Sequence, residues 1–315
     1  MKQSLFSNTQ FGYIYAMLSA IFYGCSGLFI KMAYGTGLSA IQLLILQNLI
    51  AVPTMWIIAA VKYKRSIIIS KQQLFRLFVL GSVFSSSVTF CYYQAFEYLD
   101  ISIATILLYT YPILIAIYTF LFEKEKPNWV ISLSLAFVFM GCFLILDVLH
   151  ADMSMPFIGI LYGFGSALAY AGLNIYVEKK IINELPSFLL VTYSSTFALM
   201  IFMLYEPPTF VFKGNIGLYH IGIAALLAYI TQVPPMALLY KALQLIGAVK
   251  TSIVSNIEIP TAALLGYFFY QETLTISQLS GMLLVVGGIL VMKNSEFLLQ
   301  TIATTQSFRP KKEGQ

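Results

Sequence analysis

The chain has 315 residues, of which 59% are hydrophobic and only 10% are charged. Its mean hydropathy of +0.83 excludes a water-soluble globular domain and indicates that lipid is the solvent for most of the chain. The formal net charge of +5 does not indicate nucleic acid binding, because the Lys and Arg residues gather in the links at one end of the apolar segments.

Ten apolar segments follow one another along the chain, with lengths near the roughly 20 residues that a helix needs to cross a bilayer. The links between them are short, and none could hold a soluble catalytic core. We therefore predict an all-α membrane protein with ten transmembrane helices in one bundle. The expected spans are residues 12–34, 39–61, 74–96, 101–122, 129–149, 156–177, 186–204, 216–240, 247–270 and 277–292.

The first segment and the cysteines exclude several other classes of protein. Residues 12–34 are too long for the apolar region of a signal peptide, and no convincing cleavage site follows them, so we expect a spanning helix. Cys25, Cys91 and Cys142 lie inside expected spans without CxxC spacing, which indicates packing residues rather than a disulfide or a zinc site. With only two histidines in the chain, we expect neither a metal nor another cofactor.

The distribution of basic residues predicts the orientation in the membrane. If the N-terminus is cytoplasmic, every Lys and Arg except Lys31 and Lys213 lies in or beside a cytoplasmic link. We therefore expect a multi-pass protein of the plasma membrane with both termini in the cytoplasm. Residues 296–315 are expected to form a solvated cytoplasmic tail, with at most a weak attraction of its basic end to anionic membrane lipid.

The two halves of the chain repeat each other at a constant offset of 147 residues. Because each half holds five expected spans, an odd number, the second half must enter the membrane from the opposite side. We predict two inverted five-helix repeats, residues 1–150 and 151–295, which allow a midplane site to open to either side. The matching pairs are Gly12–Gly159, Tyr15–Tyr162, Ser19–Ser166, Ala20–Ala167, Tyr23–Tyr170, Tyr93–Tyr240, Ala95–Ala242, Glu125–Glu272 and Gly141–Gly288.

Four segments carry a resemblance to a known family. They are the Tyr-x-Ala stretches YYQAFEYLDISIAT and YKALQLIGAVKTS, and the helix stretches YPILIAIYTFLFEKE and EIPTAALLGYFFYQE. With the two repeats, the chain resembles the EamA branch of the drug/metabolite transporter superfamily from about residue 12 to residue 292. The resemblance implies a transporter of small organic metabolites, often amino acids, which are commonly exported. Many members place Glu directly before the proline of the ninth helix, whereas Ile259 stands between Glu258 and Pro260 here.

Glu258 lies inside the ninth expected span, where a charge at mid-membrane depth costs about 3 kcal/mol. Thr251 and Ser255 share its helix face, so we expect this face to contact protein or water rather than lipid. Three readings stay open for the carboxyl group. It is a neutral packing residue bonded to Gln232 or Asn256, the anchor of a substrate ammonium group, or the carrier of a coupling proton.

Other polar and aromatic residues complete the candidate site. Gln232 stands beside Pro234–Pro235, which predict a kink or break in the eighth span. Tyr23 and Tyr170 occupy equivalent places in the two repeats, on a face that either packs in the core or lines a cavity. The candidate substrate-binding residues are Glu258, Gln232, Asn256, Tyr23, Tyr170, Tyr93 and Tyr111, and Glu258 is also the candidate for coupling.

We expect a secondary active transporter that exports a small zwitterionic or cationic metabolite by alternating access, with proton coupling as an option. An importer or facilitator of the same fold is the nearest alternative, since the sequence does not set the direction. A membrane-embedded enzyme is disfavoured because the sequence shows no His–acid pair, no P-loop and no clustered metal ligands. A nontransporting sensor would predict a dry, apolar centre. The expected partners are a small-molecule substrate and membrane lipid, with no nucleic acid.

Overall fold

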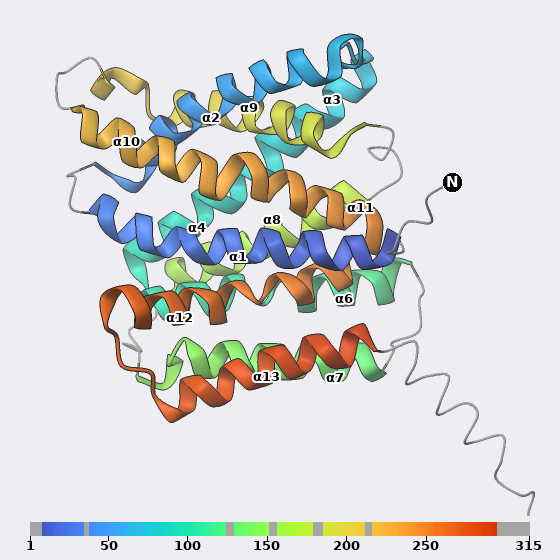
Figure 1. Ribbon diagram of the computed structural model, residues 1–315, viewed down its shortest axis with the longest axis vertical. Helices are drawn as coiled ribbons and strands as arrows, with labels where there is room; N and C mark the ends of the chain where they lie inside the picture. The colour runs from blue at the N-terminus through green and yellow to red at the C-terminus, as the bar shows by residue number, and fades with distance from the viewer. Residues whose placement is uncertain are drawn as a thin grey trace, which may run out of the picture.

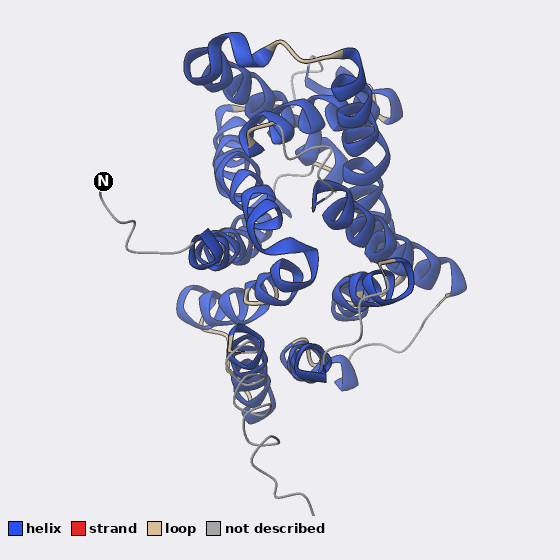
Figure 2. Ribbon diagram, turned by 90° about the vertical axis from the view of Figure 1, so that its right-hand side faces the viewer, coloured by secondary structure: helices blue, strands red, loops and turns tan. Residues whose placement is uncertain are grey.

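The computed structural model describes residues 8–34, 38–123, 129–150, 156–178, 185–211 and 216–294. Glu125, Lys213 and the expected tail 296–315 lie outside these residues. Within them, every regular element is a helix, as Figure 2 shows in a view closer to the helix ends. In Figure 1 the helices run across the view in layers, with α2 and α9 at the top and α7 and α13 at the bottom.

The first half contains α1 (Asn8–Tyr34), α2 (Ala40–Tyr63), α3 (Lys71–Val79), η2 (Leu80–Ser85), α4 (Ser86–Tyr98), α5 (Ile101–Leu108), α6 (Tyr111–Phe122) and α7 (Trp129–Ile145), with short 3-10 turns η1 (Lys64–Ile67) and η3 (Val148–His150). The second half contains α8 (Phe157–Glu178), α9 (Ser187–Tyr205), α10 (Leu218–Leu227), η5 (Ala228–Gln232), α11 (Val233–Ser255), α12 (Glu258–Tyr270) and α13 (Ile276–Lys293), with the 3-10 turn η4 (Pro208–Val211).

These helices make the ten expected membrane crossings. The apolar run Leu218–Tyr270 has 53 residues, about 80 Å of helix, which is more than twice the hydrocarbon thickness of about 30 Å. It therefore crosses twice, and it turns at Gly247, whose φ of 79° and ψ of 170° interrupt α11. Only glycine adopts this backbone conformation readily, so the eighth and ninth crossings join without a loop.

The fourth and ninth crossings are not the continuous helices expected from the sequence. A break of two residues separates α5 from α6, and another separates α11 from α12. Pro112 and Pro260 follow these breaks, and a proline lacks an N–H and clashes with the carbonyl four residues earlier. In the second half, the carbonyl of Asn256 instead accepts a hydrogen bond of 3.2 Å from the N–H of Ile259. The two breaks are related by the same offset of 147 residues as the repeats.

The third and eighth crossings also deviate at matching places, where η2 and η5 are π-helical turns. The kink or break expected at Pro234–Pro235 is confirmed, because Gln232, the last residue of η5, has a φ of −123° and a ψ of −59°, outside the α-helical range, and α11 begins directly after it with proline in its first turn. No proline lies in or directly after η2, so the sequence gives no sign of the π-helical turn in the first half. Single π turns inside α-helices are frequent at functional sites.

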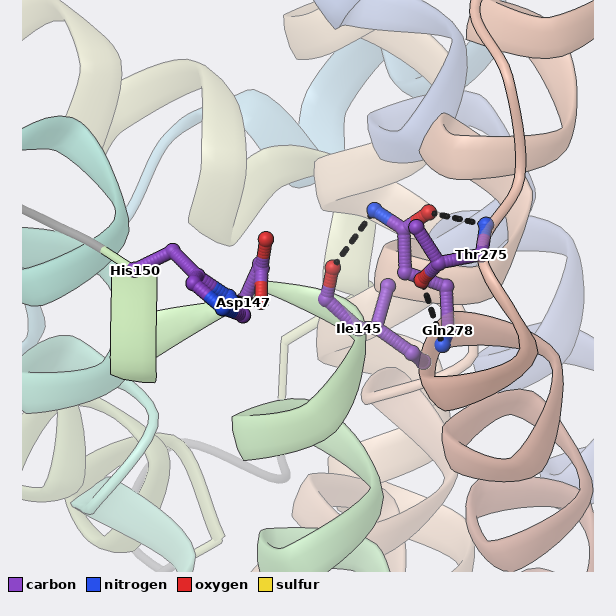
Figure 3. Close-up of polar contacts among 5 residues, drawn as sticks. All are labelled: Ile145, Asp147, His150, Thr275 and Gln278. Atoms are coloured by element: carbon purple, nitrogen blue, oxygen red, sulfur yellow. Dashed lines mark hydrogen bonds and ion pairs between the residues drawn. The ribbon is translucent and has the colours of Figure 1, made fainter.

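The last helices of the two halves, α7 and α13, lie side by side at one edge of the bundle (Figure 1). Thr275 caps α13 through a capping box with Gln278, as its S/T-x-x-E/Q spacing indicates. Figure 3 shows the Gln278 side chain donating to the carbonyl of Ile145, at the end of α7, over 3.3 Å. The start of α13 therefore adjoins the end of α7. The two helices run antiparallel, as inverted repeats require.

The halves interlock through their other helices. α1 packs on α11 and α12, while the equivalent helix α8 packs on α4, α5 and α6. α2 packs on α9 and α10. Each first helix therefore lies against the third and fourth crossings of the opposite half, and the surfaces between the halves meet at the centre of the bundle.

Candidate substrate-binding site

A cavity of about 310 Å³ opens between the two halves. It extends from Leu38, before α2, to Glu258, at the start of α12. The apolar part of its lining consists of Met236, Phe202 and Ala198 beside leucines and one valine. Its polar and tyrosine lining residues are Tyr23, Gln47, Asn48, Ser85, Thr89, Tyr92, Tyr93, Tyr109, Tyr170, Ser195, Thr231, Gln232, Tyr240 and Glu258.

Glu258 follows the helix break and opens α12, so its carboxyl group lies at a helix N-terminus, where backbone N–H groups favour negative charge. The Tyr109 hydroxyl lies near enough to this carboxyl group to interact with it. Tyr23 and Tyr170 are close enough to interact with it electrostatically. No Lys, Arg or His among the described residues forms an ion pair with it. The cavity wall therefore contains an acidic group among phenol rings, and none of the described residues that line it is a cation.

Gln232 and Asn256 do not bond to Glu258, so the neutral packing pair considered for this residue is absent. The Gln232 amide donates to Asn48 Oδ1 over 2.6 Å. The Asn256 amide donates to the carbonyl of Ser252 over 2.7 Å, and its Oδ1 lies 3.5 Å from the Cys142 sulfur. Asn256 does not line the cavity, and its contacts hold the break between α11 and α12.

Five of the seven candidate residues line the cavity, namely Glu258, Gln232, Tyr23, Tyr170 and Tyr93. Tyr111, like Asn256, lies behind the wall. Its hydroxyl donates to the carbonyl of Ser252 over 3.3 Å, and its ring centre lies 4.3 Å from that of Tyr170. Tyr111 therefore supports the position of the Tyr170 ring from behind.

Ser19 and Ser166, on the same predicted helix faces as Tyr23 and Tyr170, do not line the cavity. The Ser19 hydroxyl donates to the carbonyl of Pro235 over 2.8 Å and so joins α1 to α11. The Ser166 hydroxyl bonds within its own helix, to the carbonyl of Gly163. Tyr23 and Tyr170 thus reach the cavity, while the serines on the same two faces bond to backbone carbonyls outside it.

Three buried hydroxyl groups in the cavity wall, those of Ser85, Ser195 and Tyr240, have no partner with hydrogen-bond geometry among the residues that the structure describes. Tyr240 lies near enough to Ser85 and Ser194 to interact with them, although none of these contacts meets the geometric limits of a hydrogen bond. An unpaired buried hydroxyl costs about 1–3 kcal/mol. This part of the wall therefore favours a water molecule or a polar ligand group.

Sequence reasoning assigned no site residue to α2 or α9. Gln47 and Asn48 in α2 and Ser195 in α9 line the cavity. A signal existed for the first two, because adjacent amides inside an apolar span are as exceptional as Glu258 and invite the same functional reading. Tyr92 and Tyr109 were also missed, and tyrosines at these places do not differ in sequence from those that pack in the core.

The two histidines lie away from the cavity. His220 Nδ1 accepts from the N–H of Gly217 over 3.0 Å at the start of α10. His150 is exposed beyond the end of α7, and its Nδ1 lies 2.6 Å from Asp147 Oδ1 (Figure 3). The hydrogen bond to Asp147, together with the aspartate charge, raises the pKa of His150 above its ordinary value of 6.5.

Replacing Asp147 by asparagine is expected to lower the pKa of His150 back toward 6.5. Because the folded-state pKa is raised, this contact stabilises the fold below about pH 6.5, and its contribution is lost as the pH rises through the folded-state pKa. NMR titration of histidine-labelled protein measures the shift, with His220 as an internal control. An unchanged His150 pKa in the variant would contradict the assignment.

Ten crossings in two interlocked inverted repeats, with a partly polar cavity between them, define a multi-pass membrane transporter. The sequence profile of the EamA-like transporter family matches residues 10–147 and 157–293. The chain belongs to this family. One match falls on each half, in agreement with the internal repeat.

Relatives and one solved structure agree with this assignment. The chain is 26% identical to an uncharacterized transporter of Archaeoglobus fulgidus, over 67% of this chain and 73% of that protein. It is 22% identical to the uncharacterized transporter YcbK of Bacillus subtilis, over 91% of this chain and 93% of that protein. A crystal structure matches it with a TM-score of 0.71 at 16% identity, covering 91% of this chain and 98% of that one, which shows a shared fold.

Proposed function

We propose that the protein is a secondary active transporter for a small organic amine, amino acid or related metabolite. The observation that carries this proposal is Glu258, an acidic group in the cavity wall that pairs with no Lys, Arg or His of the described residues. A substrate ammonium group would supply that cation. The rings of Tyr23 and Tyr170 beside the carboxyl group suit cation–π contacts with the same ammonium.

The same carboxyl group supports proton coupling. Burial disfavours a carboxylate that has no counter-charge, so the empty site favours the protonated form, and an arriving ammonium favours the ionised form. A group that binds either a proton or an ammonium exchanges one for the other across the membrane. An inward proton gradient would then drive the substrate outward, which makes an exporter. Without this coupling, the same site would serve an importer or facilitator.

The proposed transport cycle uses the repeats, residues 1–150 and 151–295, which exchange conformations to open the site to either side. The breaks and π turns at matching places in the two halves are suitable hinges. The cavity extends toward Leu38, at the opposite end of α1 from its N-terminal residue. With both termini in the cytoplasm of a plasma-membrane protein, this conformation faces outward. The partly polar cavity favours a transporter over a sensor with a dry centre.

Counterflow in proteoliposomes tests the proposal. Vesicles preloaded with an unlabelled amino acid or primary amine are expected to take up the labelled compound, and a pH gradient should drive its accumulation. Succinate, a small dianion without an amine, is the negative control, and protein-free vesicles give the background. Exchange of succinate but of none of the ammonium compounds would overturn the proposed substrate class, and no exchange with any of them would overturn the transporter itself.

A further inference from the structure

Three carboxamide side chains meet in the cavity wall, Gln47 and Asn48 from α2 and Gln232 from η5. All three are buried, with exposed fractions of 9%, 3% and 6%. Gln232 donates to Asn48 Oδ1, and Gln47 Nε2 lies 3.4 Å from Gln232 Oε1. We call Gln47, Asn48 and Gln232 the amide cluster. It contains no charged group.

Backbone carbonyls at both ends fix how these amides are oriented. The Thr231 hydroxyl donates its proton to the carbonyl of Leu227, so its oxygen can only accept from Gln47 Nε2, which lies 2.8 Å away. At the other end, Asn48 Nδ2 donates to the carbonyl of Leu44 over 2.9 Å. Asn48 Oδ1 is therefore the acceptor for Gln232, and none of the three amides can turn over without losing a hydrogen bond.

This fixed orientation leaves a defined set of groups for a ligand. Gln47 Oε1 accepts no hydrogen bond from any described residue, and the amides of Asn48 and Gln232 each make one hydrogen bond with two available protons. The wall therefore offers an acceptor beside donors. A ligand that carries a donor and an acceptor side by side would satisfy both kinds of group, whereas an apolar ligand would leave them unpaired.

We propose that the amide cluster is a second recognition subsite, which selects substrates carrying a primary carboxamide or an equivalent planar group with adjacent donor and acceptor. This inference rests on the proposed function, in which Glu258 holds the ammonium group of the same molecule. The ligand N–H donates to Gln47 Oε1, and the ligand C=O accepts from Asn48 or Gln232. A carboxylate in the same place has no proton for Gln47 Oε1.

Binding of L-glutamine and L-norleucine to the full-length protein in detergent tests the subsite. The two compounds share the charged groups and differ in the side-chain carboxamide. We expect glutamine to bind about tenfold more tightly, which corresponds to roughly one net pair of hydrogen bonds. In Gln47→Met, which keeps a similar volume, glutamine should lose this advantage while norleucine binds as before.

Gln244→Met is the matched control. The Gln244 side-chain amide also donates a partly buried hydrogen bond, to the carbonyl of Leu185, but Gln244 lies outside the cavity. It should keep the preference for glutamine. Thr231→Val is a second route to the same result if Gln47→Met does not fold, since it removes the acceptor that orients Gln47.

The outcomes separate the two proposals. Equal binding of glutamine and norleucine to the unaltered protein, with both weakened by Glu258→Gln, would overturn the amide subsite and keep the ammonium site. A preference for glutamine that survives both Gln47→Met and Thr231→Val would also overturn the subsite. Binding of neither compound would overturn the proposed amino-acid substrate class and the subsite together.

Discussion

Replacing Glu258 by glutamine is expected to abolish proton-coupled transport and to weaken binding of an ammonium substrate about tenfold to a hundredfold. The magnitude follows from the loss of a charged hydrogen bond, worth about 1.5–3 kcal/mol. Glutamine keeps the size and hydrogen-bonding capacity of the side chain but can neither ionise nor carry a proton. Uptake by proteoliposomes at several pH values, with binding measured in parallel, checks both effects.

Glu123→Gln is the matched control for this experiment. Glu123 is an exposed carboxyl group at the end of α6, outside the cavity, so its replacement should leave uptake and its pH dependence unchanged. Thermal unfolding of both variants shows whether they remain folded. If Glu258→Gln transports at the original rate with the original pH dependence, the carboxyl group is a packing residue and the proposed mechanism fails.

The crossings could be predicted from the sequence because the bilayer demands long apolar helices with all backbone groups paired internally. The internal repeat made the inverted arrangement predictable as well. The helix interruptions were only partly accessible. Pro234–Pro235 marked one, and Pro112 and Pro260 explain two others once seen, but η2 contains no proline and Gly247 joins two crossings where a loop was expected.

The cavity was predictable where a residue recurred in both repeats, as Tyr23 and Tyr170 did, or stood out against its apolar surroundings. Glu258 and Gln232 did so, and both line the wall. Asn256 lies at the break between α11 and α12, and Tyr111 at the break between α5 and α6, yet both side chains pack behind the cavity wall. The sequence did not show this, because a helix that is apolar all round carries little sign of which face it turns toward the cavity. Gln47 and Asn48 also stood out in an apolar span, but the sequence does not show that they adjoin Gln232, which is far away in sequence and close only in the fold.

The seam between α7 and α13 should be sensitive to small increases in side-chain volume. A Cβ atom on Gly281 would lie 2.6 Å from the carbonyl oxygen of Gly141, and one on Gly288 would lie 2.9 Å from the carbonyl oxygen of Ser134. Both neighbours are backbone atoms, which cannot move aside without shifting a whole helix. Such close approach of small residues drives helix association in membranes, where the hydrophobic effect between helices is absent.

Gly281→Ala is therefore expected to destabilise the protein by about 1–3 kcal/mol, the usual range for overpacking. Gly287→Ala is the matched control in the same helix, because a Cβ there meets nothing within 4 Å. Alanine should be neutral or slightly stabilising at this position, since it forms helices better than glycine by about 1 kcal/mol. The midpoint of thermal unfolding in one detergent should thus fall for Gly281→Ala and hold or rise for Gly287→Ala. Equal midpoints for the two variants would mean that α7 and α13 do not approach each other through these glycines.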